Sequence, residues 1–462
     1  MATLSSLLHL GASGFRASQQ GVRAASDNIA NVDTPEFRRR QSVRSARATN
    51  TVGAGHALGG GVQVDGIKRV VDNVLERQLQ GAKAHAGFSS ARSDALSRAE
   101  VLFGDLEGVG ATSSLDALFG SFDQLAAEPQ DTGARLRVLS AAAEFATSFN
   151  TLAVGLQDQQ RELDRQIADQ VDQINTLSDR IAGLNQQIGA TEHPSEALLD
   201  ERDAAVHELS TLVGVNVIES NSMISVSLRG SGFGLVTEGV SRPLSSTTAS
   251  GAAVISGQRG ESAMALTDSL ALGTLSGTVE ARNHDLQTLT DSIDRFVFAF
   301  TAEVNRVHAA GVGADGQGGR NLFVTSPSEG GAALALQLDP ALVDNPERVA
   351  ASQDARLVPG DNRNAVELST LRQAVLTTDE TAEASLQTVI TDFADVVASV
   401  SGRLQVQTAI QDNFEQMQAG LSGVNIDEEM TLLLQYRQSY SAAAQVVRTA
   451  DELMREVVAL KR

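Results

Sequence analysis

Three short stretches of the sequence hold residue types that could do chemistry. Asp200, Asp203 and His207 are three and four residues apart, so on a helix they share one face and could offer ligands to a metal ion. The stretch RGSGFG at residues 229–234 has glycines like those of a phosphate-binding loop. The stretch ADGQGGR at residues 314–320 resembles part of a calcium loop.

Each of these stretches lacks something that its chemistry requires. No further ligand set accompanies His207, and the sequence contains no HExxH motif and no cysteine. RGSGFG lacks the third glycine at dinucleotide spacing and the strand-then-helix context of a dinucleotide site, and residues 314–320 lack acidic ligands at alternate positions. We therefore expect a charged outer helix face at Asp200, Asp203 and His207, no phosphate site at residues 229–234 and a tight turn at residues 314–320.

Composition also argues against an enzyme. The 462 residues include no tryptophan, and aromatic residues make up 4%, which is few for the walls of a ligand pocket. No GxSxG, SxxK or Walker motif occurs. We expect no catalytic residues, no cofactor and no metal site. The net charge of −21 disfavours general binding to nucleic acid, and no apolar run approaches the ~20 residues that cross a membrane.

Charge is distributed unevenly along the chain. Residues 1–77 hold ten basic and six acidic side chains, a net charge of +4, which leaves −25 for the remainder. Three consecutive arginines at residues 38–40, followed by Arg44 and Arg47, form the centre of this basic segment. Phe37 is the only aromatic residue beside them. We expect a solvated linker, or a strip that faces acidic neighbours, rather than an arm that binds nucleic acid.

Both ends of the chain have the hydrophobic period of helices that pack on other helices. N-terminal residues recur in alternating steps of four and three: Leu4, Leu8, Gly11, Phe15, Ser18, Val22, Ala25 and Ile29. The C-terminus repeats this series: Ile426, Met430, Leu433, Arg437, Tyr440, Ala444, Val447, Asp451, Met454 and Val458. Isolated helices are marginally stable, so each end must be covered by the other end, by another copy, or by both. The charged members Arg437 and Asp451 are expected to reach a partner or to extend their charged ends into solvent.

The interior predicts a long helical bundle with a small β-rich insert. Helical stripes run through four segments: residues 163–188, 198–212, 286–307 and 386–417. Ser195 is expected to be the N-cap of the second segment. Ile224, Val226 and Leu228 alternate with serines, as in a strand.

The expected fold is mainly α with a small β-rich insert, in an elongated, nested, multi-domain chain whose terminal helices pair as an α-helical coiled coil. The N-terminal assembly helix with its motif is predicted at residues 1–45 and the C-terminal assembly helix at residues 423–462. The helical body is predicted in two halves, at residues 46–215 and 276–422. The β-rich insert lies between these halves, at residues 216–275.

Particular segments resemble flagellar axial proteins. SDNIANVDTPEFRRR at residues 26–40 resembles the N-terminal signature of the flagellar rod, hook and hook-associated families, with matching residues Asn28, Asn31, Thr34, Pro35 and Phe37. Glu36 stands where these families usually have glycine. SGVNIDEEMTLLLQYRQSYSAAAQVVRTADELM at residues 422–454 resembles their C-terminal signature. The stretches GVQVDGIKRVVDNVLERQL, VDQINTLSDRIAGLNQQI and LLDERDAAVHELSTLVGV are similar to the hook-associated protein 1 family, the first hook–filament junction proteins.

The resemblance implies a structural role in the extracellular flagellum. It implies terminal helices that line a hollow tube and assemble through the two series above, together with Asn28, Asn31, Pro35 and Phe37. It also implies type III export without a cleaved signal peptide and an export chaperone at the C-terminal helix. The implied neighbours are further copies of the chain, the hook protein and the second hook-associated junction protein. The alternatives are another axial flagellar protein, such as the hook protein or the second junction protein, or a cytoplasmic helical scaffold.

Overall fold

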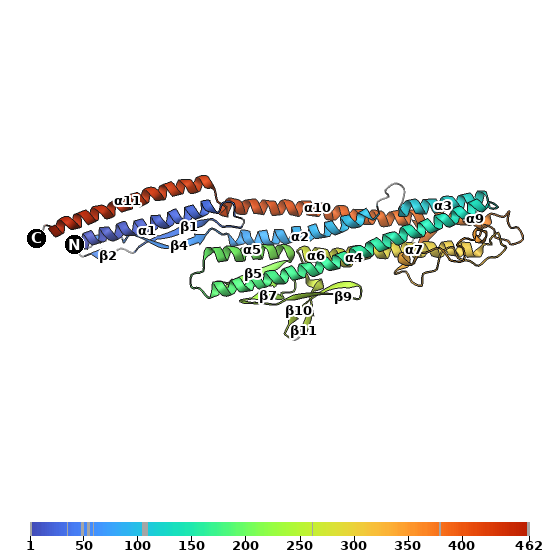
Figure 1. Cartoon of the computed structure of the whole chain (residues 1–462), viewed down its shortest axis with the longest axis horizontal. Helices are drawn as coiled ribbons and strands as arrows, with labels where there is room; N and C mark the ends of the chain where they lie inside the picture. Colours follow the sequence, from blue (N-terminus) through green and yellow to red (C-terminus); the bar gives the residue numbers. More distant parts are fainter. Residues whose placement is uncertain are drawn as a thin grey trace.

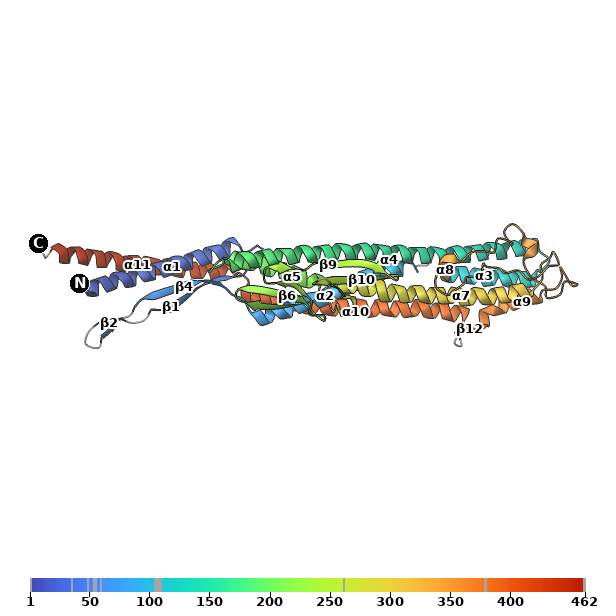
Figure 2. The same cartoon turned by 90° about the horizontal axis from the view of Figure 1, so that it is seen from below.

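The chain forms a long rod whose first and last helices lie together at one end (Figure 1). The computed structural model describes residues 2–34, 36–47, 50–52, 56–58, 60–103, 110–260, 262–377 and 380–459. Both termini lie at the same tip, because the chain runs out along the rod and returns (Figure 1, Figure 2). The predicted mainly helical, nested and elongated fold is therefore confirmed.

The end that carries both termini is a module of two helices and a β-hairpin, here called the terminal module. It comprises α1 (Ala2–Ala30), β1 (Arg40–Ala46), β4 (Val62–Arg69) and α11 (Ile426–Ala459). Strands β1 and β4 are antiparallel, and β2 (Asn50–Val52) pairs with β3 (His56–Leu58) between them. The sequence placed residues 46–69 in the helical body. The structure instead pairs them with the segment that follows α1, and the body begins only at α2.

Seven helices build the body: α2 (Asn73–Val101), α3 (Ala111–Ala127), α4 (Thr132–Gly189), α5 (Glu196–Leu212), α6 (Thr274–Glu280), α7 (Leu286–Ala310) and α10 (Ala382–Ser422). Each predicted helical stripe lies within one of them. Ser195 caps α5, as predicted, because its hydroxyl accepts the Leu198 N–H at 3.4 Å. Asp131 caps the 58-residue α4 in the same way, through the Gly133 and Ala134 N–H groups.

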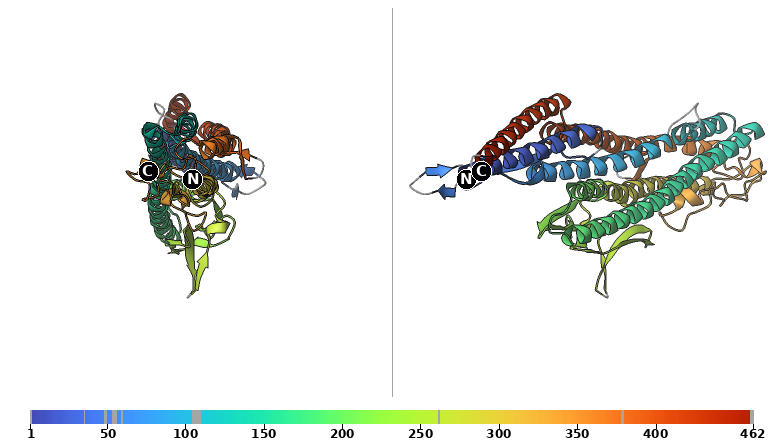
Figure 3. Two further views of the ribbon diagram at one scale, coloured as in Figure 1. Left: turned by 90° about the vertical axis from the view of Figure 1, so that its right-hand side faces the viewer. Right: turned by 60° about the vertical axis from the view of Figure 1, so that its left-hand side comes forward.

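The β-rich insert lies between α5 and α6 and packs on α4. A four-stranded antiparallel sheet has the order β5 (Val215–Ser220), β6 (Met223–Leu228), β7 (Gly234–Thr237) and β8 (Val240–Ser241). A three-stranded sheet joins β9 (Leu244–Ala249), β10 (Ala252–Arg259) and β11 (Ser262–Ala265) and projects from the side of the rod (Figure 3). Burial alternates along β6 as the sequence predicts, with Ile224, Val226 and Leu228 facing the core.

Short elements complete the chain. The far end of the rod holds α8 (Ala332–Ala335), α9 (Arg363–Thr370) and the strand pair β12 (Val375–Thr377) and β13 (Glu380–Thr381). Three 3₁₀ turns lie at Thr267–Ser269, Pro346–Arg348 and Leu371–Gln373, and a π-helical turn at Ala281–Asp285 joins α6 to α7. No helix among the described residues is both long and apolar enough to cross a membrane.

Two hydrophobic cores give the body its stability. One fills the far half between α3, α4, α7 and α10 and contains interlocked rings, including Phe119, Phe145, Phe149 and Phe300. The other lies between the C-terminal half of α4, α5, α6 and the β-rich insert. Fully burying a side chain of this size is worth ~1.5–3 kcal/mol. The terminal module contributes no residue to either core, so other contacts must hold it on the body.

Candidate assembly interface

The terminal helices α1 and α11 form an antiparallel pair whose closest approach depends on glycine. A Cβ atom built on Gly11 would lie 2.9 Å from the Val447 side chain, and one on Gly21 would lie 2.8 Å from the Tyr436 ring. Phe15 packs on Tyr440 with ring centroids 4.3 Å apart. The small N-terminal residues of the predicted series therefore let the two backbones come close, as in other tightly packed helix pairs.

The contact seam of α11 differs by one position from the predicted series at two places. Tyr436 and Ala450 face α1, and Ala450 is 2% exposed. Arg437 and Asp451 are exposed instead, and Asp451 pairs with Arg455 at 2.9 Å within the helix. Within one chain both charges extend into solvent, one of the two expected outcomes, because the contact seam follows the 3.6-residue turn rather than an exact heptad.

The other predicted interface residues separate into three groups. Asn28 is buried. Half-buried residues are Leu4, Leu8, Phe15, Val22, Ile29, Asn31, Phe37, Leu433, Val447 and Met454. Exposed residues are Ile426, Met430, Tyr440 and Val458. Pro35 lies outside the described residues.

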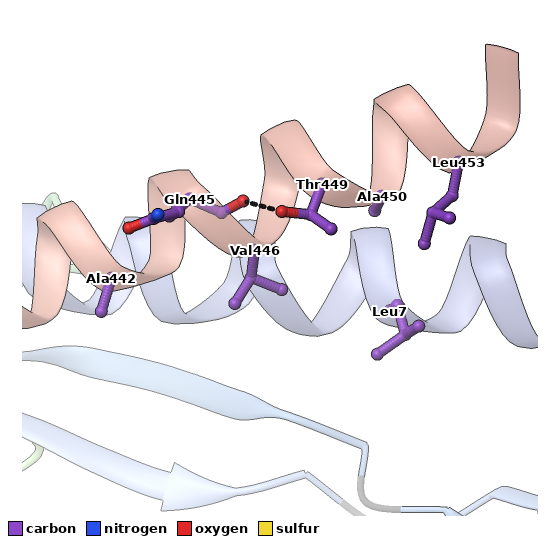
Figure 4. A pocket seen from close by; sticks show the side chains of 7 residues that line it. All are labelled: Leu7, Ala442, Gln445, Val446, Thr449, Ala450 and Leu453. Carbon is purple, nitrogen blue, oxygen red and sulfur yellow. Dashed lines mark hydrogen bonds between the residues drawn. The ribbon is translucent and has the colours of Figure 1, made fainter. Parts of the chain in front are cut away.

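An apolar stripe on α11 has no cover within the chain. The side chains of Ile426, Met430 and Leu434 lie four residues apart on one face of the helix and are 48%, 48% and 59% exposed. Towards the tip, Val446 and Leu453 of α11 and Leu7 of α1 border an open groove between the two helices (Figure 4). Single exposed apolar residues are normal, but a run along one helix marks an interaction surface.

The motif after α1 is held by an asparagine clamp. The Asn28 side chain donates to the Arg40 carbonyl at 2.9 Å and accepts the Arg40 N–H at 2.8 Å, which fixes the entry into β1. Asn31 donates to the Asp27 carbonyl at 2.9 Å and accepts from the Thr34 hydroxyl at 3.2 Å. The Arg40 guanidinium lies 4.8 Å from the Phe37 ring centroid. These residues shape the turn rather than face outward.

The three arginines at residues 38–40 point to three different parts of the molecule. Arg38 pairs with Glu76 of α2 at 3.3 Å. Arg39 pairs with Glu429 of α11 at 2.7 Å, and its N–H donates to the carbonyl of Ser422, the last residue of α10. Arg40 pairs with Asp27 of α1 and, at 3.4 Å, with Asp200 of α5. Of the two expectations for this run, a strip that faces acidic neighbours is confirmed.

The face of α5 that holds Asp200, Asp203 and His207 is covered, so the expected outer charged face is wrong. Asp200 and His207 are 9% and 3% exposed. Arg69 of β4 reaches Asp200 at 3.0 Å and Asp203 at 2.7 Å. The burial comes from β1, β4 and α2, which the chain folds over this face. Among the described residues, no group of three His, Cys, Asp or Glu side chains is arranged to hold a metal ion.

His207 bridges two carboxylates. Its Nδ1 lies 3.0 Å from Glu36 and its Nε2 lies 2.7 Å from Glu76. Burial opposes the charged form of His207, but the hydrogen bonds to both carboxylates outweigh it and raise the pKa above the usual 6.5. The hydrogen bond from His207 lowers the pKa of Glu36 to about 2 despite its burial. The sequence could not reveal this site, because its members come from three separate segments.

The glycine-rich stretch at residues 314–320 is a turn, as predicted, and the stretch at residues 229–234 is a turn as well. Residues 229–234 connect β6 to β7, with Gly230 and Gly232 at φ 104° and 66°. Residues 314–320 form a loop in which Asp315 pairs with Arg320. Positive φ values favour glycine, which explains the composition of both stretches without a ligand.

Known proteins resemble this chain over nearly its whole length. A family model described as the helical domain of the flagellar hook-associated protein FlgK matches residues 96–323, and the C-terminal model of the flagellar basal body rod FlgEFG proteins matches residues 420–460. The flagellar hook-associated protein 1 of Salmonella typhimurium is 25% identical over 97% of this chain and 99% of its own length. The proteins of that name from Escherichia coli and Bacillus subtilis are 24% and 25% identical, over 99% and 96% of this chain and 100% and 95% of their own lengths.

A solved structure shares the fold. The flagellar hook junction protein FlgK from Burkholderia pseudomallei superposes with a TM-score of 0.67 at 17% identity, covering 75% of this chain and 100% of that chain. The family models and the relatives matched over nearly their full length assign the chain to the flagellar hook-associated protein 1 family.

Proposed function

We propose that the chain is a structural subunit that self-assembles at the distal end of the bacterial flagellar hook and connects the hook to the filament. The observation that carries the proposal is the uncovered apolar stripe of α11, a helix that packs on α1 through another of its faces. A single chain leaves this stripe in water. Further copies of the chain would cover it.

The energetics favour a polymer. Each Leu- or Met-sized side chain that a neighbour covers contributes ~1.5–3 kcal/mol before the cost of association. A contact between different surfaces of successive copies builds a helical tube when its rotation does not close into a ring. In this arrangement the terminal module forms the inner layer and the body stands outside it.

The proposed assembly surface combines the exposed members of the C-terminal series, Ile426, Met430, Tyr440 and Val458, with Leu434. Arg437 and Asp451 are exposed on the same helix and remain the proposed sites of ion pairs between copies. The proposed division of the chain keeps residues 1–45 and 423–462 as assembly parts. Residues 46–69 join these parts, residues 70–215 and 276–422 form the body, and residues 216–275 form the insert.

The proposed partners follow from family membership. They are the hook protein on one side, the second hook-associated junction protein on the other, and a type III export chaperone that covers the C-terminal helix beforehand. Export without a cleaved signal peptide and a position outside the cell belong to the same proposal. We also propose that the chain has no catalytic activity, in keeping with a family of structural flagellar proteins.

Deletion of the gene tests this function. We expect cells with hooks but without filaments, and monomeric flagellin in the growth medium, measured by electron microscopy and by immunoblotting of the medium. A plasmid copy of the gene should restore filaments. Normal filaments on cells that lack the gene would contradict the proposal.

A further inference from the structure

The terminal module is attached to the body through buried charges rather than through an apolar core. Where residues 36–40 meet α2 and α5, the side chains of Arg38 and His207 are 6% and 3% exposed, and Glu76 is 12% exposed. Burying charges is costly unless each one is paired. The pairing at this site therefore helps to hold the module on the body, beside the ion pairs of Arg40 and Arg69 with α5.

The geometry requires His207 to be charged. Both of its ring nitrogens lie within hydrogen-bond distance of carboxylate oxygens, at 3.0 Å from Glu36 and 2.7 Å from Glu76. A neutral imidazole has one N–H and could donate to only one of them. With His207 protonated, its charge and that of Arg38 balance the two carboxylates. Loss of the proton would leave one buried carboxylate without its donor and the group with a net negative charge.

The backbone at Glu36 supports a specific purpose for this cluster. Glu36 has a φ of 59°, in the left-handed region that favours glycine. The chain nevertheless has a side chain there, and its carboxylate reaches both His207 and, at 3.1 Å, Arg38. A glycine would fit the backbone better and would leave His207 with one partner. The strained backbone conformation of Glu36 therefore accompanies the contact between its carboxylate and His207.

We propose that Glu36, Arg38, Glu76 and His207 form a proton-dependent latch that holds the terminal module on the body and opens when His207 loses its proton. The inference concerns a single chain and does not depend on the proposed assembly role. The closed latch fixes the direction in which α1 and α11 leave the body. The open latch lets the terminal module swing about the α10–α11 connection at Gly423.

The direction of the pH effect follows from the neighbouring charges. Other charged groups near the site are Lys83 and Arg77 of α2, Glu415 of α10, Arg69 of β4, Glu219 of β5, and Arg202 and Asp203 of α5. The neutral Gln418 of α10 donates to Glu76 at 2.7 Å. Because the pKa of His207 is raised, the latch is fully closed below pH 6.5 and opens as the pH rises through the folded-state pKa of His207.

Hydrogen exchange of the docking amides tests the latch. The N–H of Arg39 donates to the carbonyl of Ser422 in α10 at 2.9 Å, so its protection reports docking. In the full-length chain we expect the protection factor of this amide to fall about tenfold or more as the pH rises above the folded-state pKa of His207, as expected from losing a charged hydrogen bond. Amides of α4 at residues 165–188, in the body core, should keep theirs.

Two variants make the test decisive. His207→Gln removes the titration, so protection of the Arg39 amide should be low and independent of pH in this variant. Glu36→Gly relieves the positive φ yet should also lower protection about tenfold, because the latch loses a carboxylate. His284→Gln changes an exposed histidine and is the control. Wild-type protection that does not change with pH, or Glu36→Gly protection equal to or above wild type, would overturn the proposal.

Discussion

Phe15 of α1 and Tyr440 of α11 stack with ring centroids 4.3 Å apart and join the two ends of the chain. The planes are tilted by 35°, and the contact lies between the close approaches at Gly11 and Gly21. Aromatic pairs of this kind are worth ~0.5–1.5 kcal/mol beyond burial. A double-mutant cycle with Phe15→Ala and Tyr440→Ala should give a coupling energy in this range.

The composition of the chain supplies the probe for that cycle. Its two tyrosines, Tyr436 and Tyr440, both lie in α11, and the chain has no tryptophan. Tyrosine fluorescence during urea unfolding therefore reports on the terminal module alone, and Tyr436 remains in the Tyr440→Ala variant. Additive effects of the two substitutions would show that the rings do not stabilise the helix pair.

Gly11 and Gly21 of α1 should be intolerant of any side chain. A Cβ on Gly21 would meet the Tyr436 ring at 2.8 Å, and also the Arg44 guanidinium that stacks on that ring. Gly21→Ala should lower the free energy of unfolding of the terminal module by about 1–3 kcal/mol through overpacking. Gly183→Ala in α4, where a Cβ meets nothing within 4 Å, should instead raise the stability of the body by ~0.5–1 kcal/mol. Equal effects of both substitutions would contradict this account of the close approach.

Arg39 neutralises a buried carboxylate at the start of α11. Glu429 is 1% exposed and receives the Arg39 guanidinium at 2.7 Å. Arg39→Met should destabilise the terminal module by about 2–4 kcal/mol. This loss is smaller than the largest losses from breaking fully buried ion pairs, because the Arg39 side chain is partly exposed. Adding Glu429→Gln should recover most of the loss, since no unpaired charge remains. Tyrosine fluorescence follows both variants, and a double variant no better than Arg39→Met would refute the pairing.

The far end of the rod should lose stability in acid. His308 is buried, its Nδ1 donates to the Arg320 carbonyl at 2.7 Å, and its Nε2 accepts the Ala350 N–H at 3.1 Å, so it is neutral. Burial lowers the pKa of His308 from 6.5 to about 4. A depressed histidine pKa means that its contribution is present above pH 6.5 and is lost as the pH falls towards 4, a change of ~3 kcal/mol.

Hydrogen exchange at the Ala350 amide measures this acid response. Its protection should fall between pH 6.5 and 4 in the wild type and change much less in His308→Gln. The pH dependence is opposite in sign to that at His207, so the two ends of one chain can be compared in a single experiment. Protection at Ala350 that stays constant down to pH 4 would be inconsistent with a neutral buried His308.

The helices could be predicted from the sequence because their signals are local. The series through Leu163 and Ile188 lies within α4, and Ser195 caps α5 as its position before the stripe indicates. The sequence analysis assigns residues 46–69 to the body, although β4 pairs with β1 in the terminal module. This pairing joins segments about twenty residues apart across a turn and has no helical period that the sequence could reveal.

The buried ion pairs on α5 could not be predicted from the sequence, and the reason is physical. Asp200 and His207 have the composition of a solvated face, and only the folded chain brings Arg69, Glu36 and Glu76 over them. The shift from Arg437 and Asp451 to Tyr436 and Ala450 has a similar origin. An a/d series fixes a helix face to within about one residue, and the partner helix decides which neighbour turns inward.

The central claim is that the uncovered stripe of α11 joins copies of the chain, and electron microscopy of complemented cells tests it most directly. Met430→Asp with Leu434→Asp changes two exposed residues, so the purified chain should keep its tyrosine fluorescence and unfolding curve. Val240→Asp, at an exposed position of β8, is the matched control. In cells that lack the gene, we predict filaments with the control and bare hooks with the double variant. Full filaments with a stably folded double variant would contradict the claim.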